Sequence, residues 1–355
     1  MPPGARSNHV ALGELFGMPT FCDVVIATRN RPTALGRCLA GLQRQSLPAF
    51  RVVVVDDASD EDLHPIVEDA STARMPTRYV RLDQLSGPAA ARNAGVEASD
   101  AEFIVFVDDD VVPGERMLEA HLEAVSSGPA GQWIVSFGPF VQPDGWDPNP
   151  WNLWEARQAR YESESMAAGL YEPTWRQFHT GNNCLPRKAF VNAGGFNPDF
   201  KRAEDDEFGL RLHHLGCKFV FLPGAIAWHY SERSLESWLA IPRAYARFDV
   251  LIDRLHPGED YLRTKREELT ERNAILRAIR SVTNATRMTA LATRASVAAA
   301  RVSYALGRKD TACHLLSIAY DLIYCCALDD FAASGSAEKR MPRTGFTSGD
   351  ATDAH

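Results

Sequence analysis

The stretch that decides the fold is Phe103-Ile104-Val105-Phe106-Val107-Asp108-Asp109-Asp110, five apolar residues followed directly by three acids. The apolar run predicts a strand that is buried on both faces. Aspartate is a poor strand former and is costly to bury unpaired, so packing does not explain the triplet. Carboxylates at the end of such a strand face the crevice where open α/β sheets bind ligands, and two that converge can hold Mg²⁺ or Mn²⁺ against a diphosphate. We therefore expect a cation site here.

The first 140 residues alternate β-rich runs with helical patterns, which predicts an α/β fold with a mostly parallel sheet flanked by helices. After Pro32, apolar residues repeat at helical spacing at Leu35, Cys38, Leu39 and Leu42, and this predicts an amphipathic helix on the sheet. The expected strands are residues 23–27, 51–55, 77–82, 103–107 and 133–140.

The pattern changes after residue 140. Residues 141–176 are crowded with Pro, Gly and Trp and are interpreted as a long functional loop, whose tryptophans either stack on a sugar or anchor the loop by packing. A helix at 205–215, a strand at 218–221 and a nearly unbroken helical pattern at 234–328 follow. The expected domains are an N-terminal arm at 1–20, the α/β domain at 21–232, a helical C-terminal extension at 233–330 and a disordered tail at 331–355.

Composition limits the class of protein. The chain has 355 residues, and 46 acidic residues against 38 Lys and Arg give a net charge of −8, which argues against a nucleic-acid binder and favours a small-molecule substrate. The seven cysteines show no C-x-x-C spacing and are expected to be reduced. No signal-peptide pattern and no apolar stretch of ~20 residues is present, so we expect a cytoplasmic protein. Peripheral membrane contact and a homodimer through the C-terminal helices stay open.

Two further acidic features accompany the triplet. Asp56-Asp57 follows the run Val52-Val53-Val54-Val55, so two strands bring carboxylates to one edge of the sheet, although a turn or helix cap explains this pair equally well. Glu204-Asp205-Asp206-Glu207 opens a helix, where acids are favoured by the helix dipole. Four acids exceed what capping needs, and one of them could act as a general base.

A calcium-binding helix-loop-helix is the rival metal interpretation of the triplet. Asp108, Asp110 and Glu119 match the first, third and twelfth positions of that loop. The sixth position, however, is Pro113 instead of glycine, and the preceding segment is a strand. We therefore discount calcium binding of this type.

Two isolated basic residues have both a functional and a structural interpretation. Arg92 lies at the start of an alanine-rich helix, where it either pairs with a phosphate or carboxylate or is solvated. His229 lies between Trp228 and Tyr230 and is either a ligand or a partly buried neighbour of these aromatic residues. Neither G-x-G-x-x-G nor a P-loop motif is present, so phosphate must be held in another way.

Taken together, the motifs resemble glycosyltransferase family 2, whose members have the GT-A fold, and the resemblance covers residues 21–230. Single motifs are weak, but six in the right order make the resemblance specific. The matching segments are Thr28-Arg29-Asn30-Arg31-Pro32, Val55-Asp56-Asp57, Gly87 to Gly95, Val107-Asp108-Asp109-Asp110, Gly194-Gly195-Phe196 and Glu204-Asp205-Asp206-Glu207-Phe208 with Arg211-Leu212.

The resemblance implies a role for each matching residue. Asp205 is the general base. Asp57 meets the nucleotide base, Asp108 approaches the ribose and the metal, Asp110 ligates the metal, and His229 is a further metal ligand. Asp109 is left as the structural member of the triplet. The other residues expected at the nucleotide and donor sugar are Thr28, Arg29, Asn30, Arg92, Asn93, Gly181, Asn182 and Glu204.

The expected function is a metal-dependent, inverting transfer of one sugar from a nucleotide-diphosphate sugar, with UDP-sugar as the first choice of donor, to a hydroxyl-bearing acceptor. An acidic crevice repels a diphosphate, so Mg²⁺ or Mn²⁺ is needed to reverse the local charge. The Q-x-x-R-W pattern of processive members is absent after His229, which favours single-sugar transfer. Two alternatives stay open: a non-catalytic nucleotide-binding partner subunit on the same fold, and a sugar-phosphate nucleotidyltransferase.

Overall fold

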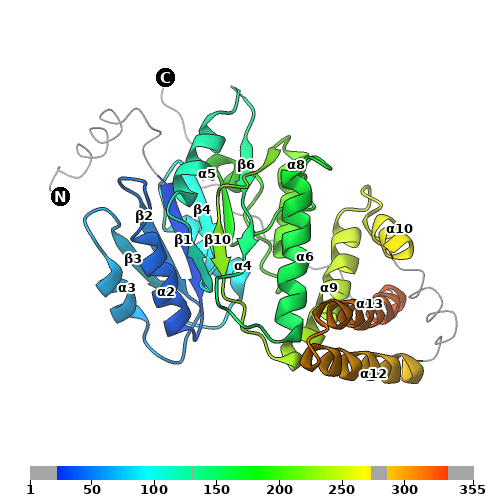
Figure 1. The fold of residues 1–355 in the computed structure, drawn as a ribbon. Coiled ribbons are helices and arrows are strands. Elements are labelled where there is room, and N and C mark those ends of the chain that lie inside the picture. The colour runs from blue at the N-terminus through cyan, green and yellow to red at the C-terminus, as the bar shows by residue number, and fades with distance from the viewer. Residues whose placement is uncertain (1–21, 130, 273–285, 335–355) are drawn as a thin grey trace. The chain divides into compact units, whose positions relative to one another are not determined.

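The computed structural model describes residues 22–129, 131–272 and 286–334, and these form two compact units (Figure 1). Within the described residues, the first unit comprises 22–143 and 160–230, and the second comprises 144–159 and 231–334. The change of unit after residue 230 lies close to the expected domain boundary at 232, but residues 144–159 belong to the helical unit. The expected N-terminal arm and most of the expected tail lie outside the described residues.

The first unit is built on a seven-stranded sheet with the order β3-β2-β1-β4-β8-β6-β9. β1, β2, β3 and β4 are parallel neighbours, and β8 pairs antiparallel with both β4 and β6. The mostly parallel α/β sheet is thus confirmed, with β8 as the strand that the sequence analysis missed. The strands are β1 Cys22–Thr28, β2 Arg51–Asp56, β3 Thr77–Arg81, β4 Phe103–Val107, β6 Ile134–Phe137, β8 Asn182–Pro186 and β9 Lys218–Phe221.

Helices connect these strands, and the first is the one predicted after Pro32. It buries Leu35, Cys38, Leu39 and Leu42 against the sheet, as their spacing indicates. Proline in the first turn has no backbone N–H to leave unpaired there. The helices of this unit are α2 Pro32–Leu42, α3 His64–Ala70, α4 Pro88–Glu97, α5 Met117–Ser126, α7 Arg187–Asn192 and α8 Glu204–His214.

The single strand expected at 133–140 is wrong, because the chain breaks into two strands that belong to different sheets. β6 ends at Phe137, and β7 (Phe140–Val141) joins a three-stranded sheet in the order β5-β10-β7, with β5 at Val111–Pro113 and β10 at Ala227–His229. Between them, a Cβ on Gly138 would lie 2.2 Å from the carbonyl oxygen of Ala225. Only glycine lets the backbone at position 138 pass this close to Ala225, and the chain changes from one sheet to the other at this point.

The long loop expected at 141–176 is also wrong in its central part, where α6 runs over Pro150–Ala167. Pro150 is its first residue, a position that tolerates proline. Trp151 and Trp154 of this helix pack against the apolar cluster around Trp238 in the second unit. The dense Pro and Trp content concealed the helical pattern, and for these two tryptophans the structure favours anchoring by packing.

The second unit is helical, as expected from the sequence. Its helices are α9 Leu235–Leu255, α10 Tyr261–Arg272, α12 Thr286–Ala305 and α13 Lys309–Ser334. Inside it, Asp249 accepts hydrogen bonds from the hydroxyls of Tyr261 at 3.0 Å and Tyr324 at 2.5 Å. Among the described helices, α13 is long and apolar enough to cross a membrane by length and composition, but 56% of the relevant window is buried.

Candidate active site

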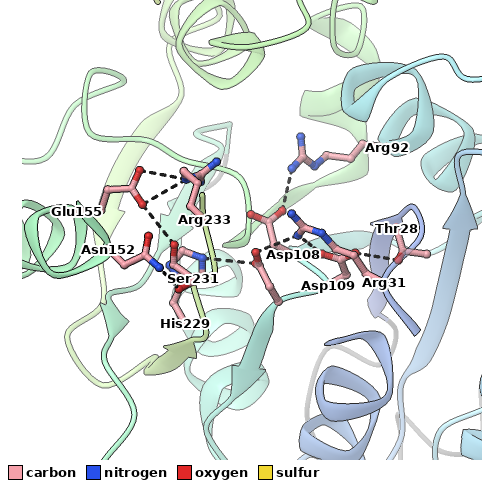
Figure 2. A network of polar contacts seen from close by, with 11 residues as sticks. Thr28, Arg31, Arg92, Asp108, Asp109, Asn152, Glu155, His229, Ser231 and Arg233 are labelled. Carbon is pink, nitrogen blue, oxygen red and sulfur yellow. Dashed lines mark hydrogen bonds and ion pairs between the residues drawn. The ribbon is translucent and has the colours of Figure 1, made fainter. Parts of the chain in front are cut away.

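The aspartate triplet lies between the end of β4 and the start of β5. Asp109 is buried, and it accepts a hydrogen bond from the hydroxyl of Thr28 at 2.8 Å and from the guanidinium of Arg31 at 2.9 Å (Figure 2). Burial raises the pKa of Asp109 to about 6. These contacts tie the end of β1 to the end of β4, in keeping with the structural role expected for Asp109.

Asp110 is held by a cation and faces an imidazole. One oxygen accepts a hydrogen bond from Arg31 at 3.0 Å, and the other lies 3.5 Å from Nε2 of His229. The backbone N–H of Tyr230 donates to the carbonyl of Asp110 at 3.0 Å, because β10 pairs with β5. His229 therefore approaches the triplet from the smaller sheet, and its ring centroid lies 5.0 Å from that of Phe140.

Arg92 joins two of the acidic features. It is only 7% exposed, and it donates to Asp108 at 2.8 Å and to Glu204 at 2.7 Å. The Arg92 to Asp108 contact is visible in Figure 2. The two carboxylates raise the pKa of the guanidinium against the opposing effect of burial, so it stays charged. Arg92 is therefore a buried bridge, and its interpretation as a solvated helix residue is wrong.

The third acidic feature starts α8. The preceding residue, Ala203, has a φ of +57°, a left-handed conformation that is strained for a residue with a Cβ. Asp205 is half-buried, and the backbone N–H of Asp206 donates to it at 3.1 Å. Burial, together with the negative charges of Glu204 and Asp206, raises the pKa of Asp205 well above its usual value. A raised pKa makes the deprotonated carboxylate a stronger base.

The acidic pair at the end of β2 is occupied by contacts within the protein. Asp57 accepts hydrogen bonds from the backbone N–H groups of Ser86 at 2.7 Å and Gly87 at 2.8 Å. Lys201 in turn donates to the carbonyl of Ser86 at 2.7 Å. Asp57 thus shapes the loop that enters α4, and its expected contact with a nucleotide base stays a prediction.

Two asparagines among the expected donor residues use their side chains within the protein. The amide of Asn93 donates to the carbonyl of Phe196 and accepts from its backbone N–H, both at 2.8 Å. Asn182 is fully buried and donates to the carbonyls of Pro139 and Ala225. Both side chains therefore connect segments of the protein that are distant in the sequence.

The remaining expected residues lie at two loops. Gly181 has a φ of +120°, and a Cβ at this position would lie 2.5 Å from an oxygen of Asp108, so only glycine fits here. Arg29 is exposed. Asn30, at a φ of +54°, exchanges hydrogen bonds with Asp60, which places it on the surface near the end of β1.

The residues expected to bind metal are neighbours but do not form a complete site by themselves. Asp110 and His229 face each other, and the charge of Asp110 contributes to the raised pKa of Asp108. Within the described ranges, no group of three His, Cys, Asp or Glu side chains has the geometry to hold a metal ion. Carboxylate ligands nevertheless suit Mg²⁺ or Mn²⁺, and a diphosphate could supply the missing oxygens.

Two functional candidates were not singled out in the sequence. Arg31 forms ion pairs with both Asp109 and Asp110. The sequence could have indicated this residue, because it follows the end of β1, and β1 is the neighbour of β4 in the sheet. His121 is fully buried, and its ring nitrogens lie 2.9 Å from the Ser136 hydroxyl and 2.9 Å from the side-chain oxygen of Asn182. No local pattern indicated this network, because its members lie on three separate elements.

Comparison with known proteins identifies relatives of this chain. The family model described as Glycosyl transferase family 2 matches residues 23–196. The chain is 30% identical over 244 residues to validoxylamine A glucosyltransferase of Streptomyces hygroscopicus, which covers 60% of this chain and 54% of that protein. It is 28% identical over 246 residues to hyaluronan synthase of Pasteurella multocida, with 61% of this chain and 25% of that protein covered. The chain thus spans about half or less of the length of these relatives.

A solved structure shows the same fold. A mannosyltransferase from Pyrobaculum calidifontis, solved with GDP-Man and Mn²⁺, superimposes with a TM-score of 0.59 at 18% identity, covering 86% of both chains. This likeness confirms the predicted GT-A fold.

Proposed function

The chain belongs to glycosyltransferase family 2, and from this premise we propose that it transfers a single sugar from a nucleotide-diphosphate sugar to a hydroxyl group. The observation that carries the proposal is the buried Arg92, which joins Asp108 at the end of β4 to Glu204 at the start of α8. Structural ion pairs are seldom built around so many like charges, since each buried carboxylate raises the cost of the next. A site that uses acids accounts for their accumulation.

Asp205 is the general base in this proposal. Its carboxylate takes the proton of the acceptor hydroxyl while that oxygen attacks the anomeric carbon, and the bond from this carbon to the diphosphate oxygen breaks in the same displacement. A single displacement inverts the configuration. The raised pKa of Asp205 supports the assignment, because a stronger base accepts the hydroxyl proton more readily.

Asp108, Asp110 and His229 would hold a divalent cation, Mg²⁺ or Mn²⁺, together with the donor's diphosphate. The cation supplies positive charge to a crevice that would otherwise repel a diphosphate. Arg31 forms an ion pair with one oxygen of Asp110, and this arginine would have to release that carboxylate for Asp110 to hold a cation. UDP is the proposed nucleotide, and the loop around Asp57 is its proposed base contact.

Two variants test the proposal. Asp110→Asn should abolish the Mn²⁺-dependent stabilisation by UDP in a thermal-shift assay, because one metal ligand is lost. Asp205→Asn should reduce turnover at least ~100-fold with donor affinity close to that of wild type, because only proton removal is impaired. Asp199→Asn, at an exposed position near the start of α8, is the matched control and should change neither quantity.

The result that overturns the assignment of the base is full activity of Asp205→Asn. Two assays of the wild-type protein distinguish the proposed function from the two alternative functions. Donor binding without hydrolysis or transfer across several nucleotide sugars with Mn²⁺ would favour a non-catalytic subunit. Release of pyrophosphate from a nucleoside triphosphate and a sugar phosphate would favour a nucleotidyltransferase.

A further inference from the structure

Helix α12 in the second unit has apolar side chains on both its inner and its outer side. The side that packs within this unit buries Val297 and Ala300 together with Thr293 and Ser296, and the hydroxyl of Ser296 donates to the carbonyl of Leu315 at 2.7 Å. The outer side exposes Met288 by 49%, Leu291 by 65% and Val302 by 60%. A surface helix normally has a single apolar stripe that faces inward, so a second stripe that faces outward marks a face that is covered by something else.

The exposed residues form a continuous stripe because their spacing follows the helix. Met288, Leu291, Ala295, Ala298 and Val302 are three or four residues apart and are all exposed, so they lie along one face. Leu306, 68% exposed and just beyond the helix end, extends the same stripe. Scattered exposed apolar residues are common, but a stripe spanning a whole helix is not.

Arginines run along one border of this stripe. Arg294 and Arg301 are exposed and seven residues apart, and Arg308 follows after the helix ends. Among the described residues, none of the three makes an ion pair, and the sequence from Thr286 to Lys309 contains no Asp or Glu. This segment is therefore basic within a chain whose net charge is −8. Within the described part of the chain these arginines have no acidic partner, so they can pair with an external anion.

Charge complementarity decides between two possible occupants of the stripe. A second copy docked through the same face would bring two rows of arginines together with no acid on either helix to offset them, which is destabilising. An anionic lipid surface instead accepts both features, since acyl chains take up the apolar stripe and phosphate headgroups pair with the arginines. α13, the neighbour of α12 in Figure 1, is largely buried, which leaves α12 to make the contact.

We propose that α12 docks the protein on an anionic lipid bilayer through the stripe Met288, Leu291, Ala295, Ala298, Val302 and Leu306, with Arg294, Arg301 and Arg308 at the headgroups. This proposal does not depend on the sugar-transfer reaction. It concerns where the protein is held and involves none of the residues assigned to the donor site.

The test is co-sedimentation of the full chain with lipid vesicles. Vesicles with about a third phosphatidylglycerol should bind at least ~10-fold more tightly than pure phosphatidylcholine, and the binding should weaken from about 0.05 to about 0.5 M NaCl. Arg294→Gln/Arg301→Gln should lose roughly 20- to 30-fold in affinity. Leu291→Gln/Val302→Gln should lose at least ~10-fold, because two large apolar side chains no longer enter the bilayer.

The matched control is Lys188→Gln/Lys218→Gln, which removes two exposed cations from the first unit and should bind like wild type. All variants should keep the wild-type circular dichroism and sugar-transfer turnover, which separates this test from that of the proposed function. Failure of the wild type to bind anionic vesicles overturns the proposal, as does equal loss in the control. A wild-type dimer that becomes monomeric in Leu291→Gln/Val302→Gln, without lipid binding, would assign the stripe to a second copy and also overturn it.

Discussion

Two strands of one sheet end in aspartates, β2 in Asp56-Asp57 and β4 in the triplet, but their carboxylates are held in different ways. At the end of β2, Asp56 accepts from the backbone N–H of Ser59 at 2.8 Å, from the Tyr79 hydroxyl at 2.5 Å and from Arg81 at 3.2 Å, and Asp57, within the described residues, accepts only from two backbone N–H groups. At the end of β4, the carboxylates are held by arginine side chains and crowd one another.

The difference separates a scaffold from a candidate reaction site. Backbone N–H groups are fixed by the fold, so carboxylates that use them are committed to shaping their loop. The side chain of Arg31 is exposed and can swing away, so Asp110 can exchange this protein partner for a ligand. Burial and the negative charge of Asp110 also raise the pKa of Asp108 above its usual value. Similar sequence signals therefore led to two different structural situations.

The largest expected effect comes from breaking the bridge at the triplet side. Arg92→Gln should lower the free energy of unfolding by ~3 to 5 kcal/mol, because Asp108 and Glu204 lose their shared buried counter-ion. Urea unfolding followed by circular dichroism measures this. Arg116→Gln, an exposed arginine paired with Glu119, is the control and should change little. A loss below ~1 kcal/mol for Arg92→Gln would show that the bridge contributes no more than a surface ion pair.

The next test compares the effects on stability of replacing a scaffold carboxylate, Asp56, and a candidate catalytic carboxylate, Asp205. Asp56→Asn should lower the free energy of unfolding by about 2 kcal/mol, because an amide group replaces an oxygen that accepts from Tyr79 and Arg81. Asp205→Asn should instead raise it at pH 8, because the folded state raises the pKa of this carboxyl and so disfavours its charged form.

The sign of the Asp205 effect sets its pH dependence. The gain from Asp205→Asn should shrink as the pH falls below the raised pKa, because the wild-type carboxyl is then neutral in the folded state. It should disappear near pH 4, where the unfolded state also takes up the proton. Asp69→Asn, on the exposed side of α3, controls for the loss of one negative charge. The distinction between scaffold and reaction-site carboxylates would be wrong if Asp56→Asn and Asp205→Asn changed stability in the same direction at pH 8.

The smallest expected effect concerns His121, which holds Asn182 beside the triplet. Burial lowers the pKa of His121 to about 4, so the folded state keeps it neutral while the unfolded state takes up a proton below pH 6.5. Stability from this group is therefore complete above pH 6.5 and is lost as the pH falls towards 4. The loss at pH 5 should be on the order of 1 to 2 kcal/mol.

The measurement is the difference between His121→Gln and wild type in unfolding free energy at pH 7.5 and pH 5. The variant should lose less stability on acidification, and His213→Gln at an exposed position should behave like wild type. The comparison with wild type is needed because Asp109 also titrates in this pH range. Its pKa is raised to about 6, so it adds stability as the pH falls, opposite to His121. Equal pH dependence in variant and wild type would exclude His121 as a neutral buried group.

Sequence reasoning succeeded where a structure depends on neighbouring residues. The strand Phe103–Val107 and the helix Pro32–Leu42 were predicted because apolar periodicity is a local property that each element displays by itself. It failed for α6, whose prolines and tryptophans resemble a loop until Trp151 and Trp154 find their apolar partners. It also missed β8, which consists of Asn182–Pro186 and is buried although its first residues are polar.

For the site, the sequence alone determined which residues carry charge and at which strand and helix ends they lie. It could therefore identify three acidic features and the family they indicate. Only the tertiary structure decided how each acid is used, because its partners come from elements far apart in the chain: Arg92 meets Glu204 across 112 residues, and Thr28 meets Asp109 across 81. Burial and hydrogen-bond partners separate a scaffold carboxylate from one that can exchange its partner, and both arise only when the chain is folded.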